Sequence, residues 1–152
     1  MNTLGIRVKP KVIIIAVYDS IENSIVNVES IKIPKALSTP EALKYVRNSV
    51  LDILREYEIN KAGLRIVESN SQNLVIHRIE IEGVIQEAFA SSTLSAYFCG
   101  QISKISAKLE MPRADFKKYI DGELEYVNVE NWNNHNKEER EAILTSLGAV
   151  NA

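Results

Sequence analysis

The chain has 152 residues, of which 45% are hydrophobic and 25% are charged, and its formal net charge is -2 at pH 7. These totals predict one globular domain over residues 1–152, without a global electrostatic attraction to nucleic acid or to an anionic membrane. A single cysteine, Cys99, excludes an intramolecular disulfide, and the longest apolar run, residues 12–18, falls short of the ~20 residues of a membrane span. We therefore expect a cytoplasmic protein with no secretory signal and no membrane partner.

The first third of the chain predicts three consecutive strands. Apolar residues alternate with polar or small ones over residues 4–8, and residues 12–18 form a continuous run typical of a strand covered on both faces. A third strand is expected over residues 25–33. Its alternation changes phase partway, which predicts a bulge near Glu29–Ser30.

A helix and then a parallel strand are predicted after these three strands. The segment Ser38-Thr39-Pro40-Glu41 is a strong helix start, with a hydroxyl N-cap, proline at the first helical position and an early carboxylate. The apolar stripe that follows predicts a helix to about residue 57. The next strand, residues 62–67, comes after a helix and is therefore expected to lie parallel to the first. Residues 74–90 fit a helix better than a strand, with Gly83 expected to permit close approach to the sheet.

The remaining elements are shorter. Residues 124–129 fit either a bulged strand or an extended arm, and Trp132 either packs onto the core or lies at an interface. Asn136 and Glu139 resemble a capping box at the start of the last helix. The other predictions are a strand at 94–99 and helices at 102–109, at 112–121 and at about 136–147. The predicted order, β-β-β-α-β-α-β followed by helices, indicates an α/β mixed sheet with helices on its faces.

This order is that of ribonuclease H-like folds, and residues 3–12 resemble the first strand of Holliday-junction resolvases of the RuvC type. A closer likeness is to small bacterial proteins of unknown function with a predicted ribonuclease H-like fold. It covers roughly residues 3–110 and is carried by Gly5-Ile6, residues 39–43, residues 56–61, Leu64-Arg65 and residues 81–85.

The resemblance implies a specific chemistry. Resolvases of this type cut phosphodiesters with two divalent ions that are held by three or four carboxylates. Carboxylates suit this role because Mg²⁺ is a hard cation that prefers oxygen ligands. The resemblance places the first carboxylate mid-sheet on the first strand, where this chain has Arg7, a residue that would repel the ions. The second could be Glu68, and the third Glu139 or Glu141. The implied metal site is therefore incomplete at its central member.

Basic residues are the alternative candidates. Nucleic-acid or partner binding is predicted for Arg7, Lys9, Lys11, Lys104, Lys108, Arg113, Lys117 and Lys118, and an ordinary solvated surface is the competing interpretation. Arg7 could instead form a structural ion pair with Glu68. His77 and Glu80 would share a helix face without making a zinc site, and Cys99 is interpreted as a small buried residue.

Three functions remain open from the sequence. The leading one is a catalytically degenerate ribonuclease H-like domain, without cofactor, that acts as a binding or scaffolding module in a nucleic-acid-associated complex. The second is a divergent Mg²⁺-dependent nuclease with a site rebuilt from Glu68, Glu80 or Glu82, and Glu139 or Glu141. The third is a structural subunit of a homo-oligomer.

Overall fold

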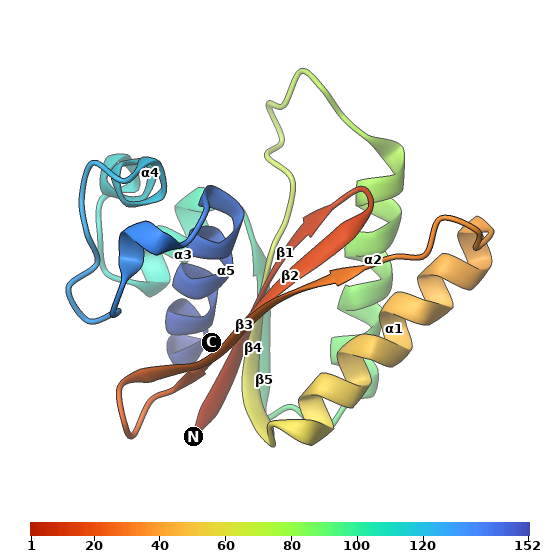
Figure 1. Ribbon diagram of the computed structural model, residues 1–152, viewed down its shortest axis with the longest axis horizontal. Helices are drawn as coiled ribbons and strands as arrows, with labels where there is room; N and C mark the ends of the chain where they lie inside the picture. The colour runs from red at the N-terminus through yellow and green to blue at the C-terminus, as the bar shows by residue number, and fades with distance from the viewer.

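The computed structural model describes all residues 1–152 and is built on one five-stranded sheet (Figure 1). Its strand order is β3-β2-β1-β4-β5, with β1, β2 and β3 antiparallel and β1, β4 and β5 parallel. The strands are β1 (Asn2–Lys9), β2 (Val12–Asp19), β3 (Ser24–Lys32), β4 (Ile59–Arg65) and β5 (Ala96–Gly100). The predicted mixed sheet, with the fourth strand parallel to the first, is confirmed.

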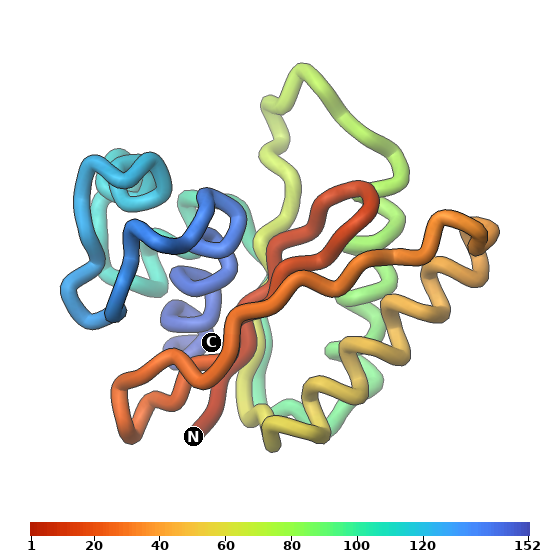
Figure 2. Tube along the Cα trace, viewed as in Figure 1, coloured from red at the N-terminus to blue at the C-terminus, as the bar shows by residue number.

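Helices cover both faces of this sheet (Figures 1 and 2). One face carries α1 (Thr39–Glu56) and α2 (Ile76–Ser91), so the helical interpretation of the segment after residue 74 is confirmed. The other face carries α3 (Ile102–Lys108), α4 (Arg113–Asp121), α5 (Lys137–Gly148) and the short turns η1 (Trp132–Asn134) and η2 (Ala149–Asn151). No helix is long and apolar enough to cross a membrane.

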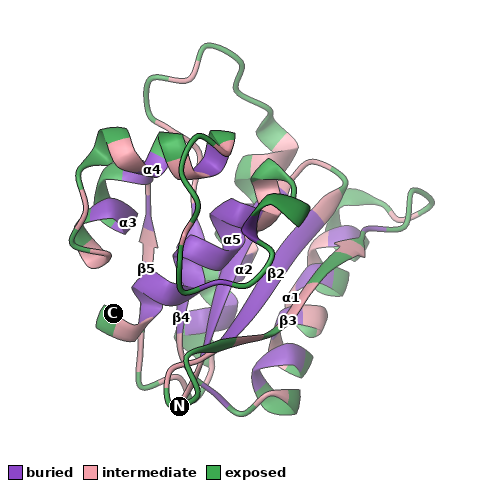
Figure 3. Ribbon diagram, turned by 60° about the vertical axis from the view of Figure 1, so that its left-hand side comes forward, coloured by how far each residue is buried: buried purple, intermediate pink, exposed green.

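Strand β2 has a continuous apolar run because both of its faces are covered. Ile13, Ile15 and Val17 pack in the core under α1 and α2, whereas Ile14 and Ala16 pack in the core under α5. Figure 3 shows this strand buried along nearly its whole length. Because successive side chains of a strand point to opposite faces, a strand covered on both faces has apolar residues at consecutive positions.

The last helix lies directly against the first strand. A Cβ atom added to Gly5 would lie 2.1 Å from the carbonyl oxygen of Ala142 and 2.3 Å from the amide nitrogen of Ser146. The Thr3 hydroxyl donates to the carbonyl oxygen of Ser146 at 2.6 Å. Gly5 therefore allows the two backbones to touch, and this contact sets the position of every α5 side chain over β1.

The capping box predicted at the start of α5 is present, and the hydroxyl N-cap predicted at the start of α1 also belongs to a capping box. The Ser38 hydroxyl accepts from the amide of Glu41 while the Glu41 carboxylate accepts from the amide of Ser38, and Asn136 and Glu139 make the same reciprocal pair at α5. Each pair satisfies amide groups that the first turn of a helix leaves without partners.

Two expectations about β3 and α2 are wrong. The bulge lies at Val26, because Val17 pairs with Asn27 while Tyr18 pairs with Ile25. No bulge occurs at Glu29–Ser30, since apolar residues on both sides of it simply serve the two cores on the two sheet faces. Gly83 makes no close approach to the sheet, because a Cβ added there would meet nothing within 4 Å.

The segment at 124–129 is a loop with turns and forms no strand. Val129 of this segment is buried in the core, and the partly buried Tyr126 packs edge-to-face against Tyr119. The ring centroids of Tyr126 and Trp132 lie 6.0 Å apart. Trp132 is 2% exposed and donates from Nε1 to the carbonyl oxygen of Tyr119 at 3.0 Å, so it packs onto the core. The apolar pattern of this segment reflects aromatic packing, which needs no ladder of strand hydrogen bonds.

Candidate functional site

Charged side chains gather at the end of the sheet where β1 and β4 finish. These strands are parallel, so their carboxyl ends meet at one edge, and the register pairs Arg7 of β1 with Arg65 of β4. The residues between β4 and α2 form a long loop above this edge (Figure 1). We define the arginine-glutamate cluster as Arg7, Arg65, Glu68, Arg78, Glu82, Arg113 and Glu141.

Glu141 of α5 holds the two strand arginines together. Its Oε2 atom lies 2.5 Å from Nε of Arg7, and its Oε1 atom lies 3.3 Å from Nε of Arg65. The side chains of Glu141 and Arg65 are only 10% and 6% exposed. Arg7 also donates to the carbonyl oxygen of Val8, and Arg65 to that of Ile66. A single carboxylate thus bridges two guanidinium groups in a nearly buried position.

Glu68 connects the loop after β4 to the helices that follow β5. Its Oε1 atom lies 3.5 Å from Nη2 of Arg113 and 4.0 Å from Nη2 of Arg65, and it accepts from the amide of Ile102 at 3.3 Å. Arg113 is the exposed member, with 54% of its side chain accessible. Glu68 therefore joins the buried part of the cluster to a solvent-facing guanidinium.

Glu82 supplies the third carboxylate from α2. It accepts from Nε of Arg78 at 2.8 Å, an i,i+4 pair, and from the amide of Val67 at 3.1 Å. The Glu82 side chain is buried, so its charge is satisfied by this arginine and this backbone amide. Glu82 anchors the start of the loop above the sheet edge to α2.

The cluster holds four arginines against three carboxylates. Burial lowers the pKa of Arg65 and Arg7 lowers it further, while Glu141 acts in the opposite direction. Two buried guanidinium nitrogens, Nε of Arg65 and Nη2 of Arg78, have no hydrogen-bond acceptor. For Arg65, the 3.3 Å contact with Glu141 lacks hydrogen-bond geometry. The cluster therefore has a positive excess and unused donors.

A pair of divalent ions does not fit these side chains as they are arranged. No three carboxylate, imidazole or thiol groups come together in a metal-binding group, and every carboxylate of the cluster already contacts an arginine. Mg²⁺ requires oxygen ligands that are free to approach it. The Arg7 guanidinium occupies the position over β1 where the resemblance placed a carboxylate.

The expected pair between Arg7 and Glu68 does not form. Arg7 pairs with Glu141 because its side chain lies on the α5 face of β1, where Gly5 brings that helix into contact. The other carboxylates proposed for a rebuilt site are engaged elsewhere. Glu139 caps α5, and Glu80 lies 3.3 Å from Nδ1 of His77.

The predicted basic residues have varied surroundings. Lys9 pairs with Glu138 at 3.6 Å, and Arg113 belongs to the cluster. Lys104 donates to the carbonyl oxygen of Cys99, and Lys108 donates to that of Asn151. Lys117 and Lys118 are exposed on α4, and Lys11 lies at the turn between β1 and β2. Only Arg7 and Arg113 of the predicted set join the cluster.

Arg65 and Arg78 were not among the predicted site residues, although Leu64-Arg65 is one of the segments that carry the family likeness. Arg78 carried a usable signal, because an arginine four residues before Glu82 on one helix favours an ion pair. Arg65 is the last residue of β4, and nothing in its local sequence distinguishes a buried strand-end arginine from an exposed one. Its role depends on the parallel register that sets it beside Arg7.

The chain was compared with known proteins. No family model matches it, and no curated protein matches it. Among solved structures, RuvC of Thermus thermophilus in complex with a Holliday junction substrate is similar, with a TM-score of 0.72, 11% identity, and coverage of 99% of this chain and 94% of that chain. The yeast mitochondrial Holliday junction resolvase has a TM-score of 0.58, 13% identity, and coverage of 98% and 77%. These likenesses confirm the predicted ribonuclease H-like fold of the RuvC type.

Proposed function

We propose that this domain binds the phosphate backbone of nucleic acid at the arginine-glutamate cluster and does not cut it. One observation carries this proposal: each carboxylate at the sheet edge is already paired with arginine, and Arg7 stands over β1 where a nuclease of this fold would need a carboxylate. The fold likeness to proteins solved with Holliday junctions supports nucleic acid as the ligand class.

Arginine chemistry supports phosphate as the group that is bound. A planar guanidinium presents paired N–H donors that match phosphate oxygens, and the cluster holds four arginines against three carboxylates. Arg113 is the member that solvent reaches most readily, so it is the first residue a phosphate would meet. The net charge of the whole chain is -2, so this attraction has to be local.

The test measures binding and cleavage on the same molecules. Fluorescence anisotropy with a labelled four-way DNA junction, duplex and single strand gives the affinity, and gels with Mg²⁺ or Mn²⁺ report cleavage. We expect saturable binding without cleavage, weakened severalfold by Arg113→Gln. Arg55→Gln is the matched control, because Arg55 is an exposed arginine paired with Asp52 on α1. Equal binding by both variants would contradict the proposal.

A divergent Mg²⁺-dependent nuclease is the second candidate, favoured by the likeness to RuvC over 99% of this chain. This function requires Arg7 and Arg65 to leave Glu141 so that it can join Glu68 and Glu82 as ion ligands. Cleavage that needs Mg²⁺ and is abolished by Glu68→Gln would establish it and overturn the first proposal. A homo-oligomeric structural subunit stays a prediction, favoured by dimerisation without any salt-dependent nucleic-acid binding.

A further inference from the structure

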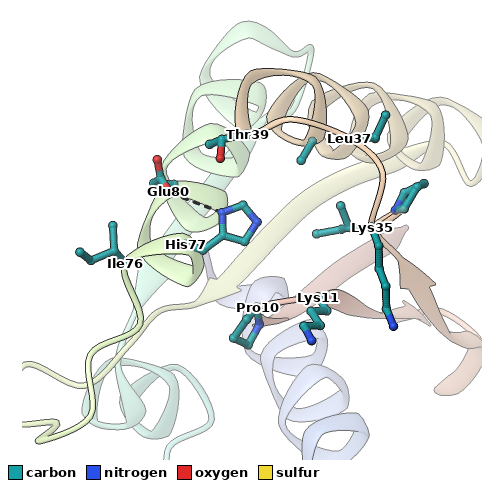
Figure 4. Close-up of a pocket in the computed structure, with 11 residues that line it drawn as sticks. Pro10, Lys11, Lys35, Leu37, Thr39, Ile76, His77 and Glu80 are labelled. Atoms are coloured by element: carbon teal, nitrogen blue, oxygen red, sulfur yellow. Dashed lines mark hydrogen bonds and ion pairs between the residues drawn. The ribbon is translucent and has the colours of Figure 1, made fainter.

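A separate cleft lies on the α1 and α2 side of the sheet. It has a volume of about 610 Å³ and is bordered by the β1–β2 turn at Pro10 and Lys11, by the loop from β3 to α1, and by the first turn of α2 (Figure 4). None of its lining residues belongs to the arginine-glutamate cluster. The cleft is therefore a second surface, distinct from the proposed phosphate-binding edge.

The floor of the cleft is aliphatic. Ile33, Leu37 and Ala42 line it and belong to the core beneath α1 or pack against it. Ile76 stands at its border with 75% of the residue exposed, and the neighbouring Leu74, Val75 and Ile79 are exposed as well. Contiguous exposed aliphatic residues beside a cleft are a feature of protein-binding surfaces.

The charged residues around this floor are mainly cationic. Lys11 and Lys35 border the cleft on the strand side, and neither makes an ion pair within the chain (Figure 4). On the α2 side, His77 and Glu80 contact one another, so the only carboxylate at the cleft is partly engaged. The α2 helix also begins here without a side-chain cap or an acidic residue in its first turn. These features favour an anionic group at the rim.

We propose that this cleft docks an acidic peptide segment of a partner protein. The branched aliphatic side chains of the peptide would pack on the floor of the cleft, and its carboxylates would lie near Lys11 and Lys35. Nucleic acid fits the cleft less well, because no Phe, Tyr or Trp lines it to stack on a base. This docking site goes beyond the proposed function, since it uses another face and another ligand class.

A second copy of this chain is the main competing occupant. The loop at residues 121–130 is acidic and carries Leu124 and Val127 exposed, so its chemistry also matches the cleft. Docking of that loop would join copies head to tail, and such contacts produce growing chains or rings. A measurement of self-association therefore distinguishes a second copy of the chain from a partner peptide as the occupant.

The experiment uses the full chain and a fluorescein-labelled peptide, Asp-Asp-Leu-Glu-Ile-Leu-Glu-Asp, measured by anisotropy. We expect saturable binding that falls about tenfold in Lys11→Glu/Lys35→Glu and in Ile76→Ser. Both changes are at surface positions, so the fold is retained. Arg55→Glu/Lys137→Glu makes the same change in net charge at exposed positions outside the cleft and should leave the affinity unchanged.

Several outcomes would overturn this proposal. Among them are the absence of saturable binding, equal binding by the cleft and control variants, and equal binding of a peptide with Asn and Gln in place of its acidic residues. Sedimentation that shows concentration-dependent self-association, lost in Lys11→Glu/Lys35→Glu, would assign the cleft to a second copy. Loss of DNA binding in that same variant, with Arg113 intact, would assign it to nucleic acid.

Discussion

Glu141 is the residue on which the charged edge of the sheet depends. It contacts both Arg7 and Arg65, which are register neighbours on parallel strands and would otherwise face each other with like charges. Removing one member of a nearly buried ion pair costs far more than removing an exposed one, because the remaining charge keeps its desolvation penalty without compensation. Here the loss would leave Arg7 without an ion pair and Arg65 with only the 4.0 Å contact to Glu68.

We therefore expect Glu141→Gln to lower the free energy of unfolding by about 3 kcal/mol. Glu138→Gln on the same helix is the matched control, because its ion pair with Lys9 is half exposed, and its cost should stay below about 1 kcal/mol. Urea denaturation monitored by circular dichroism measures both values. A similar cost for the two variants would show that the buried bridge contributes no more than a surface pair.

The thiol of Cys99 also has a pKa that the folded structure shifts. Burial raises the pKa of its thiol from 9.0 to about 11, with Lys104 opposing the shift. The folded chain therefore retains the proton more strongly than the unfolded chain. The raised pKa of Cys99 adds to the free energy of unfolding. This contribution is fully present below pH 9.0 and is lost as the pH rises toward about 11.

This shift predicts slow alkylation of Cys99 in the native protein. Iodoacetamide at pH 8 reacts with the thiolate, so modification should be much slower than for the same chain in denaturant. Mass spectrometry of timed samples measures the two rates. Cys99 is half-buried rather than fully buried as expected from the sequence, and native and denatured rates within a factor of about two would contradict a shielded, protonated thiol.

At the scale of elements, the contact of α5 with β1 sets the geometry of the site. Gly5 allows the helix backbone to touch the strand, and this approach carries Glu141 over Arg7. Gly83, by contrast, lies in α2 with open space beside it. The two glycines thus have different surroundings: a side chain at Gly5 would clash with α5, whereas one at Gly83 would not. The sequence alone does not show this, because each glycine is followed by an apolar residue.

Alanine substitution should affect the two positions in opposite directions. Gly5→Ala places a Cβ against helix backbone, so we expect a loss of about 3 kcal/mol or failure to fold. Gly83→Ala removes a poor helix former without a clash and should raise stability by up to about 1 kcal/mol. Thermal and urea unfolding measure both. A tolerated Gly5→Ala would mean that α5 can move away from β1.

At the scale of the whole molecule, the proposed binding to nucleic acid would have to overcome a net charge of -2. Phosphate contacts made by a local arginine group release counterions, so affinity should fall as salt rises. We expect log Kd to increase linearly with log salt concentration for a four-way junction, and Arg113→Gln to reduce that slope by about 1. Affinity that is independent of salt would exclude a backbone-binding role for the cluster.

Local sequence determined the elements of this protein, because caps and hydrophobic periodicity are short-range features. Ser38 with Glu41 and Asn136 with Glu139 began their helices as predicted, and the apolar run of β2 indicated a strand covered on both faces. The presence of Arg7 on the first strand was equally readable. Together these features specified the mixed sheet and raised the question of whether a metal site exists.

The tertiary structure alone decided which charges meet. Glu141 is 134 positions from Arg7 in the chain, and no local pattern distinguishes it from Glu68 as a partner. The choice depends on α5 packing against β1 at Gly5 and on the parallel register that sets Arg65 beside Arg7. Such long-range packing brings arginines and glutamates from distant parts of the chain together in one cluster, which is largely buried except at Arg113.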